Sequence, residues 1–199
     1  MKVKIKKQGK TESFNLINSW SDVNLSTWLS LIDFETGTKT EEATEKIAAL
    51  SDIPKKLIKE LALSDVAVIM SKIGELQAKQ DTKLKRIIEI NGVEYGFHPD
   101  LDSISLGEYA DIEQFIKNGI DSSLPELMAV LYRPIKLKKN DIYIIDSYDG
   151  DIRLRAEEMK LMSAEQVQSA LMFFFALGRK LSEIMPSFLM ERLQEMKTQ

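Results

Sequence analysis

Two short runs of alternating apolar residues stand out near the middle of the chain. They are Ile87–Ile90 and Val93–Phe97, and they flank the dipeptide Asn91-Gly92. Asn-Gly readily adopts the positive φ values of a two-residue type I′ turn, so this pattern predicts a β-hairpin.

An amphipathic helix is predicted directly after this hairpin. Ser105 and Glu108 have the spacing of a capping box, in which each side chain bonds to the backbone of the other residue. The apolar residues that share one face of the predicted helix are Leu106, Tyr109, Ile112, Phe115 and Ile116. The unit is a hairpin that leads into a helix, and its residues indicate packing rather than a reaction.

A similar unit is predicted at the start of the chain. Residues 3–6 and 13–16 form the strands around a turn at Gly9, and a helix follows to about Gly37. Gly9 and Gly92, like Phe14 and Phe97, are 83 positions apart. Further along, apolar residues match at a separation of 81: Val23 with Ile104, Leu25 with Leu106, Trp28 with Tyr109, Leu31 with Ile112, and Phe34 with Phe115. This spacing indicates an internal duplication. The alternative is that the two units match only because amphipathic helices generally resemble one another.

Helical periodicity dominates the rest of the chain. The further predicted helices are 41–50 with Thr40 as its cap, 65–79, 124–132 stopped by Arg133-Pro134, 152–162, 163–185 and 188–196. Residues 141–145 suit a strand or an extended segment, and the polar stretch 77–85 suits a linker. The predicted fold is α+β and predominantly helical, with two β-hairpin–helix units and a helical C-terminal half. We expect domains at 1–80 and 81–199, or one compact domain.

The composition narrows the function classes. The chain has 199 residues, 44% of them hydrophobic, a formal net charge of −4 and no cysteine. A protein that binds nucleic acid through phosphate contacts usually carries a basic excess, so we expect no nucleic-acid partner. The longest apolar run, residues 170–177, is far below the roughly 20 residues that span a bilayer, so we expect no membrane partner either.

Two motifs resemble functional sites, and each has a plainer interpretation. His98-Pro99-Asp100 is the tripeptide of J-domain cochaperones, but here it lies between a predicted strand and a helix cap, where a turn explains it. A second group resembles a calcium loop: Asp146, Asp149, Asp151 and Glu157. Its alternate positions hold Tyr148 and Gly150 where an EF-hand needs oxygen ligands, so a solvated turn is the better interpretation.

The inventory of reactive residues does not favour an enzyme. His98 is the only histidine, and the chain has no GxGxxG, P-loop or GxSxG motif. Carboxylates are numerous, but they stand at helix starts and opposite lysines, as on a solvated surface. We expect no catalytic residues, no cofactor and no metal.

Two groups of residues are instead candidates for binding a partner. Tyr132 and Arg133 close the apolar helix 124–132 with side chains that are enriched at interaction hot spots, although the same helix also suits a protein core. The second group surrounds the three consecutive phenylalanines at 173–175, which span too wide an arc to share one helix face. Its predicted members are Met172, Phe173, Phe175 and Met190, where the methionines would adapt to a partner.

Three stretches together resemble proteins encoded among the structural genes of tailed bacteriophages. They are Ser105–Glu113 (SLGEYADIE), Leu127–Pro134 (LMAVLYRP) and the apolar stretch that begins at Ala170 (ALMFFF); the early Ser19–Val23 (SWSDV) also matches. This group, often described as tail assembly chaperone-like, includes proteins from crAss-like phages. The resemblance covers most of the chain, and its motifs are packing motifs.

The resemblance implies a non-enzymatic phage morphogenesis protein that binds other virion or tail proteins, most simply as a tail or virion assembly chaperone. The alternative is a stoichiometric virion structural component, such as a head-tail connector or a packaged cargo protein. The expected location is the host cytoplasm during assembly, or the virion for the alternative. A homo-oligomer is a further alternative for the assembly state.

Overall fold

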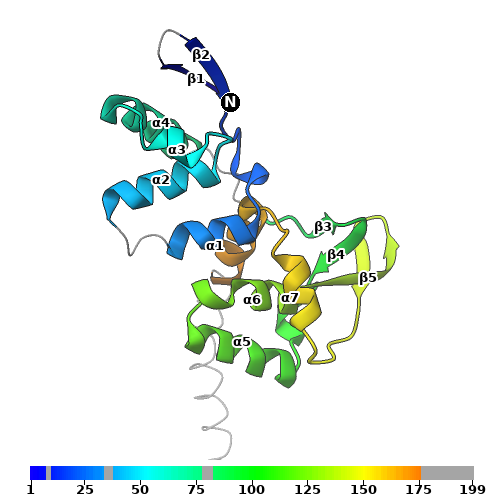
Figure 1. Cartoon of the computed structure of the whole chain (residues 1–199). Coiled ribbons are helices and arrows are strands. Elements are labelled where there is room, and N and C mark those ends of the chain that lie inside the picture. The colour runs from blue at the N-terminus through cyan, green and yellow to red at the C-terminus, as the bar shows by residue number, and fades with distance from the viewer. Residues whose placement is uncertain (8–9, 34–37, 78–82, 176–199) are drawn as a thin grey trace, which may run out of the picture.

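The computed structural model describes residues 1–7, 10–33, 38–77 and 83–175, and it shows helices in both halves of the chain together with two antiparallel sheets (Figure 1). The predicted α+β, predominantly helical fold is confirmed. The predicted helix 188–196, the later part of 163–185 and the candidate residue Met190 lie outside the described residues.

The first part of the chain forms a hairpin followed by four helices. In chain order the elements are β1 (Lys2–Lys7), β2 (Lys10–Asn15), the 3-10 helix η1 (Trp20–Asp22), α1 (Leu25–Asp33), α2 (Lys39–Ala49), α3 (Lys55–Ile58) and α4 (Leu63–Gln77). Helix α2 begins earlier than predicted, because Thr38 rather than Thr40 is its cap. The Thr38 side chain accepts from the Glu41 N–H, and the Glu41 carboxylate accepts from the Thr38 N–H and hydroxyl.

The second part combines a four-stranded sheet with helices. Its elements are β3 (Ile87–Ile90), β4 (Val93–Phe97), η3 (Leu101–Ser103), α5 (Leu106–Asn118), η4 (Asp121–Ser123), α6 (Leu124–Leu131), β5 (Tyr132–Lys139), β6 (Ile142–Ile145) and α7 (Arg153–Met159). The strands are all antiparallel, in the order β3-β4-β5-β6. Helices α5 and α6 are therefore inserted between two neighbouring strands.

The sequence pattern did not predict strand β5. Helix α6 ends at Leu131, close to the predicted stop, but the chain then pairs with β4 through Tyr132, Arg133 and Pro134. Pro134 stands near the start of this central strand and next to an irregularity in the pairing of Ile135 and Leu137, which are the settings in which a sheet tolerates proline. The hairpin β3–β4 is thus half of a larger sheet, and the predicted turn is confirmed, with Asn91 at φ 51 and Gly92 at φ 77.

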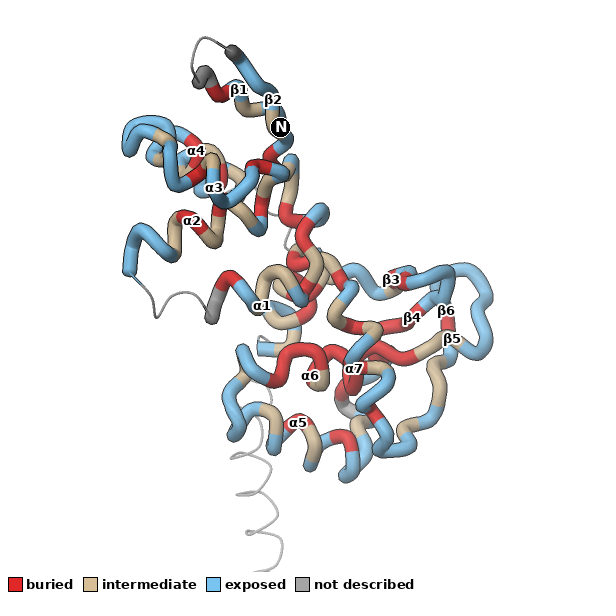
Figure 2. The backbone as a smooth tube through the Cα atoms, in the orientation of Figure 1, coloured by how far each residue is buried: buried red, intermediate tan, exposed pale blue. Residues whose placement is uncertain are grey.

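The hydrophobic core consists of two clusters, which α1 and the helix of residues 164–175 connect. One cluster gathers residues of β1 to α4 together with Ala164, and the other gathers residues of β3 to α7 together with Leu25, Met162, Val167 and Ala170. Trp28 packs against both clusters. Figure 2 shows α6 buried along most of its length at the centre of the second cluster. Each cluster therefore includes a residue from the other side of the predicted domain boundary at residue 80.

The backbone of the two parts joins in one short pairing. Leu25 N–H donates to Met162 O at 2.7 Å, and Ala164 N–H donates to Val23 O at 2.7 Å. Asn24 and Ser163 form the antiparallel bridge between them. This pairing fixes the start of α1 against the start of helix 164–175.

The order hairpin, 3-10 helix, α-helix occurs twice. Trp20 and Leu101 begin the 3-10 helices and Leu25 and Leu106 begin the α-helices, in each case 81 positions apart. The surroundings differ, because β1–β2 is a separate sheet and β3–β4 pairs further with β5. The internal duplication stays a prediction.

Candidate interaction surface

The helix of residues 164–175 carries the predicted docking residues, and its start follows the predicted capping box. Gln166 N–H donates to Ser163 Oγ at 3.2 Å, and Ser163 N–H donates to Gln166 Oε1 at 3.1 Å. Ala164, Val167 and Ala170 are fully buried at 0% exposure. One side of this helix is therefore fixed in the core.

The other side of the same helix is exposed at its last described turn. Met172, Phe173 and Phe175 are 56%, 39% and 49% exposed. Phe174 between them is partly buried against the second cluster. Three of the four predicted residues are thus exposed within one turn of the helix, and we call them together the Met172–Phe175 surface.

Phe173 connects this surface to the interior. Its ring meets the edge of Phe97 at a centroid distance of 5.5 Å, and Phe97 in turn meets Tyr132 at 5.1 Å, both in T-shaped geometry. Such aromatic pairs add stability beyond the area they bury. Phe173 is therefore partly structural, whereas Met172 and Phe175 are more accessible to a partner.

Tyr132 and Arg133 do not belong to any surface, which corrects their assignment as partner-binding residues. Tyr132 is 0% exposed and its hydroxyl donates to Lys85 O at 2.7 Å, while Arg133 is 4% exposed. Burial raises the pKa of the Tyr132 hydroxyl, so it stays protonated as a donor. The two residues lie inside because Leu131 is followed by a strand that enters the sheet, not by a loop at the surface.

Arg133 instead forms a buried charged cluster with Glu108 and His98. Arg133 Nη2 lies 2.8 Å from Glu108 Oε1, an ion-pair contact without hydrogen-bond alignment, and His98 Nε2 lies 3.5 Å from the same oxygen. Glu108 Oε2 accepts from Ser105 N–H at 2.8 Å and from Ser105 Oγ at 2.5 Å. The carboxylate therefore ties the start of α5 to strand β5 and to the residue after β4.

The protonation states in this cluster follow from burial and from the neighbouring charges. Burial lowers the pKa of His98, and the positive charge of Arg133 lowers it as well. Glu108 and Asp100 act in the opposite direction, but they do not outweigh these two effects. Burial alone would raise the pKa of Glu108, but the two Ser105 bonds and the charges of Arg133 and His98 outweigh it, so that the pKa is lowered. At neutral pH the cluster holds a neutral imidazole beside an ion pair.

The ring of Tyr148 extends the cluster. Arg133 Cζ lies 5.8 Å from the centroid of the Tyr148 ring, within the range of a cation–π interaction. The Tyr148 hydroxyl donates to Asp111 on α5. Every charged member faces a partner in the fold. The arrangement suits a connection between α5, β5 and the loop after β6, and the structural role of His98 stays a prediction.

The two motifs that resemble functional sites, His98-Pro99-Asp100 and the acidic group around Asp149, both lie in turns whose side chains or backbone bond within the fold. His98-Pro99-Asp100 lies between β4 and η3, and Asp100 O accepts from Ser103 N–H at 3.2 Å, which suits a turn. Asp149 accepts from Asp151 N–H at 3.1 Å and lies 3.6 Å from Arg155. Within the described ranges, no group of three histidines or carboxylates is arranged to hold a metal ion.

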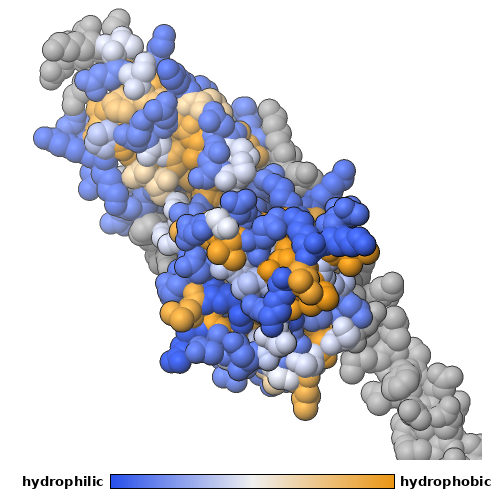
Figure 3. All heavy atoms as spheres, turned by 90° about the vertical axis from the view of Figure 1, so that its right-hand side faces the viewer, coloured by the Kyte–Doolittle hydropathy of each residue, from blue (hydrophilic) through white to orange (hydrophobic). Residues whose placement is uncertain are grey.

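The sequence analysis missed a second exposed apolar group, on the hairpin β5–β6. Leu137, Ile142 and Ile144 are 67%, 79% and 57% exposed, and Leu137 and Ile144 are cross-strand neighbours. This hairpin lies on the side of the molecule that faces the viewer in Figure 3, where hydrophobic patches stand among hydrophilic residues. The alternation of residues 135–145 around Asn140-Asp141 was the available signal.

Comparison with protein-family models, with curated proteins and with solved structures found no match to this chain. Among the helices of the described residues, none has both the length and the apolar character needed to cross a membrane.

Proposed function

We propose that this chain is a non-enzymatic binding protein of phage morphogenesis, and that it acts as an assembly chaperone for tail or virion proteins. The observation that carries the proposal is the Met172–Phe175 surface, which presents two aromatic rings and a methionine on a helix whose other side is fixed in the core. Exposed apolar surface of this kind marks interaction sites in soluble proteins. The resemblance of the packing motifs to phage tail assembly chaperone-like proteins supports the assignment to morphogenesis.

The chemistry of the surface fits a partner that is not yet fully folded. Met172 has a flexible, polarisable side chain that can follow an irregular apolar surface, while the two rings supply contact area. Phe175 also meets Phe174 at 6.0 Å between ring centroids, so its position is supported by a partly buried neighbour. A chaperone needs this combination of a fixed base and adaptable contacts.

Substitution of the exposed side chains tests the binding site. Met172→Ser and Phe175→Ser should keep the thermal midpoint within a few degrees, because both residues are about half exposed. They should abolish co-purification with the tail and virion proteins of the same phage when these are expressed together. Leu154→Ser on α7, where the side chain is 80% exposed, is the matched control and should leave co-purification unchanged.

Mass spectrometry of purified particles separates the chaperone from the alternative structural component. A chaperone should be absent from mature particles or present in traces, whereas a connector or cargo protein should be stoichiometric. If the soluble variants retain every partner that the unchanged chain captures, the Met172–Phe175 surface is not the binding site.

A further inference from the structure

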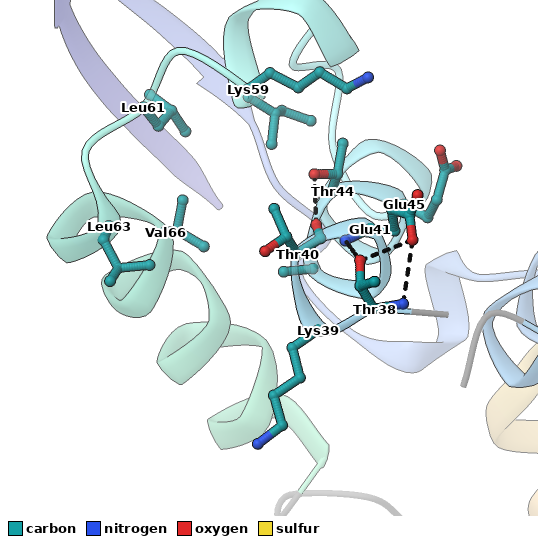
Figure 4. Close-up of a pocket in the computed structure, with 12 residues that line it drawn as sticks. Thr38, Lys39, Thr40, Glu41, Thr44, Glu45, Lys59, Leu61, Leu63 and Val66 are labelled. Carbon is teal, nitrogen blue, oxygen red and sulfur yellow. Dashed lines mark hydrogen bonds between the residues drawn. The ribbon is translucent and has the colours of Figure 1, made fainter. Parts of the chain in front are cut away.

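A groove lies between α2 and the segment α3–α4, in the part of the molecule that the proposed function does not use. Its volume is about 720 Å³. In Figure 4, Leu61, Leu63 and Val66 lie on one side of the groove, and Thr40 and Thr44 of α2 lie on the other. Leu63 is 85% exposed, whereas Ile58, which also lines the groove, is 3% exposed. The groove therefore has an apolar side that is open to solvent.

The acidic residues that line the groove already have partners within the fold. Glu41 accepts from Thr38 N–H and from the Thr38 hydroxyl, which lower the pKa of its carboxyl group. Both carboxylate oxygens of Glu45 accept from Lys55 Nζ, at 2.9 and 2.6 Å. Lys55 therefore offsets the charge of Glu45, whereas Glu41 keeps its negative charge and is held in place by Thr38.

The basic residues of the groove differ from Glu45 in their ion pairing. Lys39 and Lys59 lie towards opposite ends of the groove in Figure 4, and both are exposed. Lys59 acts electrostatically on Glu41, but in the described part of the chain neither lysine forms an ion pair. Two lysine charges thus stand against the one carboxylate, Glu41, that has no described lysine within ion-pair distance, so the net charge available in the groove is positive.

We infer that this groove binds a peptide segment of a partner protein that presents aliphatic side chains together with carboxylates. The aliphatic side chains would pack against Leu61, Leu63 and Val66, and the carboxylates would pair with Lys39 and Lys59. Amphipathic segments commonly bind in such grooves between helices, and complementary charges fix their orientation. The inference adds a second binding site to the chain and does not depend on the Met172–Phe175 surface.

A set of three synthetic peptides tests the inference with the full-length protein. The probe is a 12-residue amphipathic peptide with leucines on one helical face and glutamates elsewhere. The second peptide replaces every glutamate by lysine, and the third keeps the glutamates but replaces every leucine by serine. Amide shifts of the isotope-labelled protein locate the bound peptide, and their titration gives the affinity at low and at physiological salt.

The probe should shift the amides of residues 38–45 and 58–66, and added salt should weaken its binding. Leu63→Ser should weaken binding without unfolding the protein, because the side chain is already exposed. Lys39→Glu with Lys59→Glu should weaken the probe about tenfold, the size expected for two exposed ion pairs, and should allow the lysine peptide to bind. Leu154→Ser on α7 is the control and should change nothing.

Three results would overturn the inference. The lysine peptide binds the unchanged protein as well as the glutamate peptide does; the shifts lie at residues 172–175 or elsewhere outside the groove; or no shift occurs at millimolar peptide. The second result would leave the proposed function intact and assign peptide binding to the Met172–Phe175 surface alone.

Discussion

Gly96 lies directly against the ring of Tyr143, which reaches from β6 across β5 to strand β4. A Cβ atom at residue 96 would stand 2.4 Å from Tyr143 Cε2 and 2.6 Å from Cδ2. The ring cannot move aside freely, because its hydroxyl donates to Phe97 O at 2.7 Å and to Arg86 O at 3.2 Å. Only glycine at residue 96 therefore permits the close approach of the Tyr143 side chain to strand β4.

Gly96→Ala should lower the free energy of unfolding by about 2–3 kcal/mol, the upper range for inserting one methyl group into a packed core. Urea unfolding checks this value. Gly74→Ala in α4 is the matched control, because nothing lies within 4 Å of its added Cβ and alanine favours a helix. Equal effects of the two substitutions on the free energy of unfolding would show that an alanine side chain fits between residue 96 and Tyr143 without strain.

The buried pair of Glu108 and Arg133 should show strong coupling. Arg133→Met leaves a buried carboxylate without its cation, and Glu108→Leu leaves a buried guanidinium, so each single variant should lose about 3–5 kcal/mol. The double variant should recover most of the loss, since an apolar pair carries no desolvation penalty. A double-mutant cycle of urea unfolding measures the coupling, and additive losses would contradict it.

Acid should destabilise the fold in two successive steps. The pKa of His98 is lowered by burial from its ordinary 6.5, so the unfolded chain takes up the proton first and stability falls as the pH drops below about 6.5. The pKa of Glu108 is lowered from 4.5, so its contribution is present above about 4.5 and is lost as the pH falls through the folded value. Both groups act in the same direction.

His98→Gln should remove the first of these steps and keep the second. Urea midpoints measured between pH 7.5 and 4 test this, with the midpoint at pH 7.5 changing little. The same variant should retain co-purification with virion proteins, because we assign His98 a structural role. Loss of co-purification in a folded variant would revive the cochaperone interpretation of His98-Pro99-Asp100.

Two capping boxes of equal design should differ in strength. Thr38 and Glu41 cap α2 at the surface, whereas Ser105 bonds to Glu108, which is 3% exposed. Thr38→Ala should cost about 0.5–1 kcal/mol, and Ser105→Ala about 2 kcal/mol, because the hydroxyl bond that it removes goes to a buried carboxylate, which keeps only the bond from the backbone N–H. Equal losses would mean that the burial of Glu108 adds nothing to the strength of the hydroxyl bond.

Local signals in the sequence predicted the elements that depend on neighbouring residues. Asn91-Gly92, the capping boxes at Ser105 and Ser163, and the end of α6 near Arg133-Pro134 all follow from side chains within a few positions. The later elements were harder, because β5 exists only through its pairing with β4, far away in the sequence.

The candidate surface was predictable only in part, for the same reason. Three consecutive phenylalanines must point in different directions, so exposure of some of them followed from helix geometry alone. The burial of Tyr132 and Arg133 did not follow, because it depends on Glu108, Lys85 and Phe97 in other elements. The groove between α2 and α4 likewise arises from packing, and no local pattern in the sequence indicates it.

The pairing of residues 23–26 with 160–164 has a consequence for synthesis on the ribosome. Leu25 and Ser26 donate to Met162 and Lys160, so the start of α1 finds these backbone partners only after residues 160–162 have been synthesised. Ala164 completes the first core cluster at an equally late stage. Until then, the start of α1 lacks these partners, and we expect trigger-factor-type holdases to bind ribosome-stalled chains that end before residue 160 more strongly than longer chains in which residues 160–175 have left the ribosome.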